Sequence, residues 1–146
     1  MKHFGSKMEY ADERIRNLMR VYDRHLSECS HIRMPDIYQA VADSPAERFW
    51  VSEVRASVVV SAMLRGAEHL RMRPLKREMF EEICRRVVDL QKVHPDWPMT
   101  ALCTEVVAQP APKFYISGGS VKIMICKARK KWITEKLKRL RLYGCL

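Results

Sequence analysis

Hydrophobic runs long enough to cross a membrane are missing from this 146-residue sequence. No apolar run approaches the roughly 18 to 20 residues that a transmembrane helix needs. The N-terminus also lacks the apolar core of a signal peptide. We therefore expect a soluble, intracellular protein, with residues 1–8 as a flexible tail. The content of 47% hydrophobic and 30% charged residues is that of a chain that folds around a core.

Motifs for metal binding and catalysis are absent as well. The five cysteines are odd in number and contain no C-x-x-C pair, which favours reduced thiols over a disulfide framework. The five histidines are scattered, and no H-E-x-x-H, EF-hand, Walker, G-x-G-x-x-G or G-x-S-x-G pattern occurs. We therefore expect no metal, no cofactor and no enzymatic activity.

Acidic residues are scarce toward the C-terminal end. The net charge is +10, and residues 74–146 hold 15 basic against 7 acidic residues, whereas residues 1–73 hold 12 against 10. From Lys113 onward, Glu135 is the one acid among ten basic residues. Such a concentrated positive field attracts a polyanion, and the usual polyanion of a cell is nucleic acid. The alternative interpretation is a solvated basic helix that keeps the protein in solution.

An approximate internal repeat is the most distinctive feature that the sequence does contain. The stretch "SPAERFWVS" at residues 44–52 returns as "QPAPKFYIS" at residues 109–117, which is 65 positions later. Of the eight pairs that follow the first position, four are identical and three are conservative. The apolar pattern continues on both sides at the same offset, as in Ile37 opposite Leu102. This periodicity indicates a duplicated structural unit.

Apolar spacing predicts three helices in each copy, and Pro74 marks the boundary between them. The first unit, residues 9–73, has a long helix over about 9–29, a short one that Pro45 stops, and a third after Ser52. The second unit, residues 74–146, has helices over about 75–93, 99–108 and 119–142.

The repeated stretch is interpreted as a joint between two helices. In each copy a proline ends the short helix, and an aromatic residue (Phe49 or Phe114) is expected to plug into the core. A serine (Ser52 or Ser117) then stands where its hydroxyl can cap the third helix.

A short helix, a joint and a capped third helix, packed on a longer first helix, are the plan of the helix-turn-helix unit. With the motifs "PAERFWVS" and "PAPKFYIS", the sequence resembles tandem helix-turn-helix DNA-binding proteins of bacterial phages and mobile elements. The resemblance implies an all-α fold of two tandem three-helix units and a role in transcription regulation or DNA architecture. The joints of about eight residues are longer than the three or four usual in that family, and the usual glycine of the turn is missing.

The two third helices differ in chemistry. Residues 54–64 are apolar on nearly every side, which predicts an internal packing surface or a homodimer interface. The third helix of the second unit is strongly basic and is the predicted nucleic-acid-binding element. The residues predicted to contact nucleic acid are Lys113, Lys122, Lys127, Arg129, Lys130, Lys131, Lys136, Lys138, Arg139 and Arg141.

Two other functions remain open at this point. A basic helix does not distinguish duplex DNA from structured RNA, so an RNA-binding module is one alternative. A protein-interaction adaptor, which binds through residues 54–64 and uses the basic tail for solubility, is the other. We expect Trp132 to lie in the core. For Trp50 and Tyr115 we prefer a structural role at the joint between the units over base stacking. Gly118 and Gly119 are either a plain turn or an approach for a phosphate.

Overall fold

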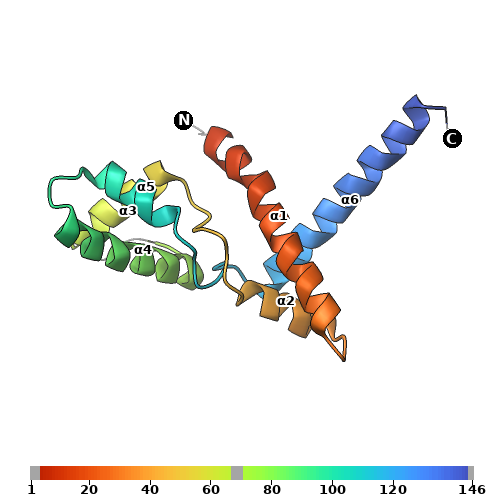
Figure 1. Ribbon diagram of the computed structural model, residues 1–146, viewed down its shortest axis with the longest axis horizontal. Coiled ribbons are helices and arrows are strands. Elements are labelled where there is room, and N and C mark those ends of the chain that lie inside the picture. The colour runs from red at the N-terminus through yellow and green to blue at the C-terminus, as the bar shows by residue number, and fades with distance from the viewer. Residues whose placement is uncertain (1–3, 67–70, 145–146) are drawn as a thin grey trace.

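The computed structural model describes residues 4–66 and 71–144, with side chains from Tyr10 onward. This part of the chain forms six helices and one isolated antiparallel bridge, which confirms the predicted all-α class (Figure 1). None of the six is long and apolar enough to cross a membrane. The helices are α1 (Phe4–Glu28), α2 (Met34–Ala42), α3 (Glu53–Leu64), α4 (Pro74–Val93), α5 (Met99–Val107) and α6 (Gly118–Leu142).

Helix boundaries recur at the spacing of the sequence repeat. The first and last residues of α5 lie 65 positions after those of α2, and α6 begins 65 positions after α3. α1 is longer than predicted, because it begins at Phe4. The expected tail over residues 1–8 is therefore helical from Phe4 onward, and residues 1–3 lie outside the described residues.

The six helices pack as two groups of three. α1, α2 and α6 contact one another through α2–α6, α1–α2 and α1–α6, whereas α3, α4 and α5 form the second group (Figure 1). This grouping differs from the contiguous units 9–73 and 74–146 that the sequence predicts. Each group takes two helices from one half of the chain and its third helix from the other half. Consecutive helices α2 and α3 therefore do not form a helix-turn-helix pair.

The two joints cross at a short antiparallel contact. Ala46 and Ala111 each donate a backbone N–H to the other's carbonyl, both at 3.0 Å. On either side of this bridge, Phe49 N donates to the Val107 carbonyl at 3.0 Å. Phe114 N likewise donates to the Ala42 carbonyl at 3.1 Å. At the 65-residue offset, the bond from Phe49 to Val107 corresponds to the bond from Phe114 to Ala42. The crossing is therefore close to two-fold symmetric. These bonds satisfy backbone groups that would otherwise be buried without partners.

The same positions of the two halves supply the buried core. Most buried residues of the first half correspond to a position 65 residues later in the sequence that is also buried. Examples are Leu18 with Ile83 and Val41 with Val106. Phe49 and Phe114 are both buried at the crossing, as the sequence predicts. Ser52 and Ser117 each accept a hydrogen bond at 3.1 Å from the amide three residues later, which confirms the predicted caps.

Candidate nucleic-acid interface

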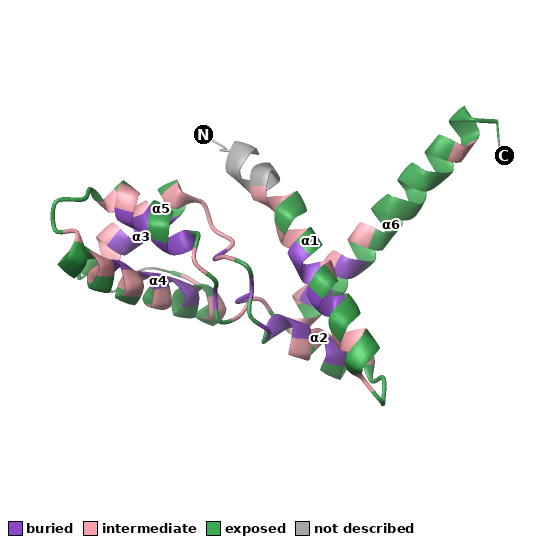
Figure 2. Cartoon of the chain, in the orientation of Figure 1, coloured by how far each residue is buried: buried purple, intermediate pink, exposed green. Residues whose placement is uncertain are grey.

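Helix α6 has a packed half and a free half. Val121 and Ile125 are buried where α6 crosses α1 and α2. From Lys131 to the end of the helix every residue is exposed except Leu140, which is half-buried. In Figure 2 this part of α6 extends away from both packed groups, toward the C-terminus. The free half is therefore a helix that a large partner can approach from several sides.

Lys113 is placed differently from the other predicted contacts. It lies in the joint before α6, and its ammonium group is 2.6 Å from the carboxylate of Glu78. The side chain is only 27% exposed, and its nitrogen lies 5.4 Å from the centroid of the Tyr115 ring. Because its charge is matched inside the protein, Lys113 is better explained as a contact between the joint and α4.

Arg129 anchors α6 to α1. Its guanidinium donates a hydrogen bond of 3.3 Å to the hydroxyl of Tyr22 and lies 5.1 Å from the centroid of that ring. The Tyr22 ring in turn stacks on Tyr38 of α2, with 6.1 Å between the centroids. Arg129 thus joins the three helices of its group, although its side chain still reaches the surface.

The remaining eight predicted contacts are all exposed on α6. In the described part of the chain none of them forms an ion pair with a carboxylate. Lys136 has an aromatic partner, because its nitrogen lies 4.8 Å from the centroid of the Trp132 ring. The eight residues are Lys122, Lys127, Lys130, Lys131, Lys136, Lys138, Arg139 and Arg141.

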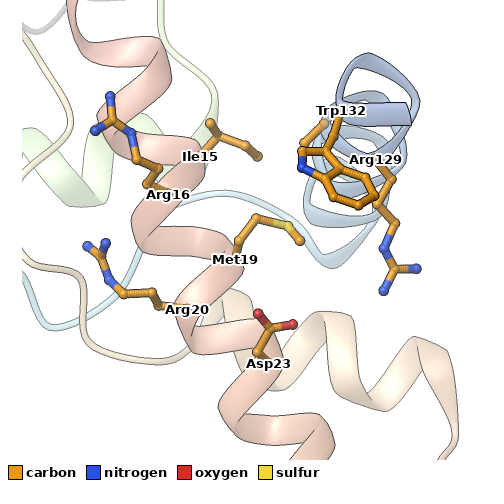
Figure 3. A pocket seen from close by; sticks show the side chains of 8 residues that line it. Ile15, Arg16, Met19, Arg20, Asp23, Arg129 and Trp132 are labelled. Carbon is orange, nitrogen blue, oxygen red and sulfur yellow. The ribbon is translucent and has the colours of Figure 1, made fainter. Parts of the chain in front are cut away.

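Trp132 does not belong to the core, and that prediction is wrong. The side chain is 57% exposed and faces Ile15 and Met19 of α1 across an open cleft of about 550 Å³ (Figure 3). In Figure 3 the guanidinium groups of Arg16 and Arg20 point away from Trp132, so the space between the two helices is lined mostly by apolar atoms. The stripe of α6 that is buried at Val121 continues to Trp132, but α1 and α6 diverge before they reach it.

Trp50 and Tyr115 have structural roles at the crossing. The indole N–H of Trp50 donates to the Asn17 side chain at 3.2 Å. Tyr115 is buried and stacks on Phe49, with ring centroids 6.2 Å apart. Its φ of 58° lies in the left-handed region, which a side chain enters only where surrounding contacts require it. The preference for the joint over base stacking agrees with these contacts. The sequence analysis did not identify Asn17, which is buried, as the partner of Trp50.

A cluster next to the crossing was also missed by the sequence analysis. Tyr10 donates a hydrogen bond of 2.7 Å to Glu53, and the Arg48 guanidinium carbon lies 4.3 Å from the centroid of the Tyr10 ring. Burial opposes ionisation of Glu53, but the bonds from Tyr10 and Arg48 keep the pKa of this carboxyl below its usual value. This cluster ties the start of α3 to α1, between the two packed groups.

Gly118 is needed for packing between helices. A Cβ atom at this position would lie 3.1 Å from Oε1 and 3.3 Å from the backbone nitrogen of Gln39 in α2. The glycine therefore permits the close approach of α6 to α2. At Gly119 a Cβ atom would meet only the Ser117 hydroxyl, at 3.8 Å.

The helix over residues 54–64, which was predicted to form an internal packing surface or a homodimer interface, is largely used inside the chain. Ala56, Val59 and Val60 are buried in the group of α3, α4 and α5. Val54 and Val58 remain exposed. The apolar area that this helix offers to a second copy is thus smaller than its composition indicates.

The remaining candidates for chemistry are the possible metal ligands and the cysteine thiols. Among the described residues no three side chains of histidine, cysteine, aspartate or glutamate come together as a metal site. The four described cysteines are free thiols. Burial raises the pKa of the Cys103 thiol to about 11, so it stays protonated and unreactive near neutral pH. No protein-family model matches the chain, and neither a curated protein nor a solved structure matches it.

Proposed function

We propose that the protein binds duplex DNA through the exposed cations of α6 and acts without catalysis, as a regulator or architectural factor. The observation that carries this proposal is the eight lysines and arginines of α6 that have no carboxylate partner in the described residues. A charge that is already paired would lose that partner on binding. An unpaired, solvated charge releases counterions from the nucleic acid at no such cost.

The shape of α6 favours duplex DNA over duplex RNA. Its free half is exposed on nearly all sides, as a helix must be if it is to enter a groove. The major groove of B-form DNA admits an α-helix, whereas that of A-form RNA is too deep and narrow. Continuous basic helices that lie in the major groove are an established docking geometry.

We further propose that the two halves are copies of one three-helix unit whose third helices have been exchanged. The helix boundaries, the caps and the crossing contacts all repeat at one offset. In this interpretation α6 replaces α3 on the first pair of helices, and the added length of α6 carries most of the DNA contacts.

A charge-reversal experiment tests the DNA proposal. Binding of a 24-base-pair duplex is followed by fluorescence anisotropy between about 50 and 300 mM salt. Reversal of four exposed cations should remove about four phosphate contacts and make the log–log salt slope shallower by roughly 3 to 4, at about −0.9 per contact. The affinity at 100 mM salt should fall by at least about 100-fold. The four positions changed to Glu are Lys130, Lys131, Lys138 and Arg141.

A charge-matched control separates the proposed surface from general electrostatics. The control variant carries four Glu substitutions at exposed cations of α1, α3, the segment after α3, and α4. It should retain a salt slope within about 1 of the parent, since these side chains lie outside α6. Equal losses in both variants would refute a defined surface, and stronger competition by duplex RNA than by duplex DNA would refute the groove argument. The control positions are Arg24, Arg55, Arg65 and Lys76.

A further inference from the structure

Helix α6 carries another exposed stripe, which is apolar at most of its positions. Six positions from Ile123 to Leu140 alternate in steps of three and four residues, which is the heptad spacing of a coiled-coil seam. Of these, Ile123 is 57% exposed, Ile133 51% and Leu137 42%. Cys126 and Lys130 are also exposed, and Leu140 is half-buried. We call these six positions the α6 seam; they are Ile123, Cys126, Lys130, Ile133, Leu137 and Leu140.

The α6 seam differs from the face by which α6 packs in the chain. Val121 and Ile125 are buried against α1 and α2, whereas Ile123 and Cys126 are exposed on the same two turns. The seam is therefore exposed from Ile123 to Leu137 and partly exposed at Leu140, over a length of 18 residues, or about 27 Å at 1.5 Å per residue. An exposed, ordered row of this length is typical of a surface that a partner helix covers.

Charge on the two flanks indicates what that partner is. On one flank of the seam lie Lys122, Arg129 and Lys136, and on the other lie Lys127, Thr134 and Arg141. Five of the six flanking residues are cations, and none is an acid. In a coiled coil these positions face the corresponding positions of the partner and decide which partner binds.

A second copy of α6 is a poor match for this seam. A parallel pair would place the cations of one flank against those of the other. An antiparallel pair would place each flank against itself, again with like charges facing. Nucleic acid accounts for the cations but not for the apolar row, because Ile133 and Leu137 gain nothing from contact with phosphates. An acidic helix with its own apolar heptads satisfies both the charges and the apolar row.

We propose that the α6 seam is a docking site for an acidic amphipathic helix of a partner protein, which pairs with it as a two-stranded coiled coil. Lys130 occupies a core position of the seam, and a single lysine at such a position fixes the register and favours a two-stranded assembly. The partner thus carries apolar residues that oppose Ile133 and Leu137, with glutamates or aspartates beside them.

The first test uses a synthetic probe with the full-length chain. The probe is a 21-residue helical peptide with leucine and isoleucine at the seam positions and glutamate on both flanks. The matched control peptide has lysine on both flanks. Titration calorimetry should show binding of the acidic peptide and none of the basic one. Binding of both peptides alike, or of neither, would overturn the proposal.

A second arm separates the seam from simple charge attraction. The double variant Ile133→Ser/Leu137→Ser keeps every cation of α6, and both side chains are exposed, so the fold should be retained by circular dichroism. It should bind the acidic peptide about 100-fold more weakly, because two apolar side chains lose their burial. The control variant Val54→Ser/Val58→Ser on α3 should bind the peptide like the parent. Unchanged binding in the seam variant would refute the proposal.

Two further measurements assign the seam to another occupant if the proposal fails. Sedimentation that shows a dimer of the parent chain, lost in the seam variant, would assign the seam to a second copy. Binding to phosphatidylserine vesicles that is lost in the seam variant, without binding of the acidic peptide, would assign it to a membrane surface. DNA binding by the seam variant should equal that of the parent, so this test is independent of the proposed function.

Discussion

A disulfide between the two joints would test the exchange of third helices. Ala46 and Ala111 face each other as a hydrogen-bonded antiparallel pair, with both N–O distances at 3.0 Å. The Cα atoms of such a pair are about 5.5 Å apart, within the range of about 4.4 to 6.8 Å that a disulfide spans. The double variant Ala46→Cys/Ala111→Cys should therefore form an intrachain link on mild oxidation.

The expected gain in stability follows from the length of the closed loop. The two positions are 65 residues apart. In the chain-entropy treatment, a link that closes such a loop removes unfolded-state entropy worth about 4 kcal/mol at 25 °C. Strain at the new bond subtracts from this value, so about 4 kcal/mol is the upper bound for the difference between oxidised and reduced forms.

Peptide mapping and urea unfolding are the assays. Digestion of the oxidised variant should yield one linked peptide pair that contains positions 46 and 111, and the urea midpoint should fall when the link is reduced. The single variants Ala46→Cys and Ala111→Cys control for pairing with the native thiols. If the linked pair does not form, or if its formation lowers stability, the crossed joints are refuted.

Three further predictions concern the fold. Phe49→Ala should lower the free energy of unfolding by about 3 to 5 kcal/mol, because the ring is 1% exposed at the crossing; a loss below about 1 kcal/mol in urea would contradict its core position. Ser117→Ala should cost about 1 kcal/mol through loss of the α6 cap, and an unchanged thermal midpoint would argue against the cap. Hydrogen bonds from Arg85, and then from Arg86, keep the pKa of Glu82 below its usual value. Ionised Glu82 therefore stabilises the folded state above the unfolded pKa of about 4.3, and this contribution is lost as the pH falls through the lower pKa of the folded state. Glu82→Gln should flatten the acid side of a stability–pH profile, and a profile parallel to the parent's would exclude this role.

The sequence predicts the helices and their joints well because these depend on local chemistry. The prolines that end α2 and α5, and the serines that cap α3 and α6, act within a few residues of their own positions. The apolar positions of the cores follow from the same spacing. Leu18 and Ile83, for example, are both fully buried, and both lie in the apolar register that the repeat defines.

The contacts of α6 with α1 and α2, and of α3 with α4 and α5, could not be predicted from the same pattern. In the two halves, corresponding core positions hold residues of similar size and polarity, such as Ala56 and Val121 or Val60 and Ile125. An apolar stripe on α3 or on α6 therefore suits either pair of helices. The choice depends on the crossing of the joints, which involves backbone hydrogen bonds between residues 65 positions apart. Such bonds leave no trace in side-chain periodicity.

The position of Trp132 shows a second limit of periodicity. Its place on the stripe of Val121 and Ile125 correctly identifies the face of α6 that is directed toward α1. Periodicity does not show how far the neighbouring helix extends along that face. α1 and α6 diverge beyond their crossing, so the same stripe is buried at Ile125 and open at Trp132. Periodicity also does not show that Lys113, a predicted DNA contact, pairs with Glu78, because the two residues are distant in sequence.

The free half of α6 is costly to maintain, and among the described residues it has little packing that compensates for it. A helix of about twelve residues is marginal in water without tertiary contacts. Like charges three or four residues apart, as in Lys127 with Lys131 or Lys138 with Arg141, destabilise it further. α3, the corresponding third helix of the other group, has only twelve residues. A packed group of three helices therefore forms without the extra turns of α6. A polyanion that lies along α6 would neutralise these repulsions, so binding should increase the helicity of this segment. The added length and charge are therefore better explained by a partner of opposite sign than by the stability of the fold.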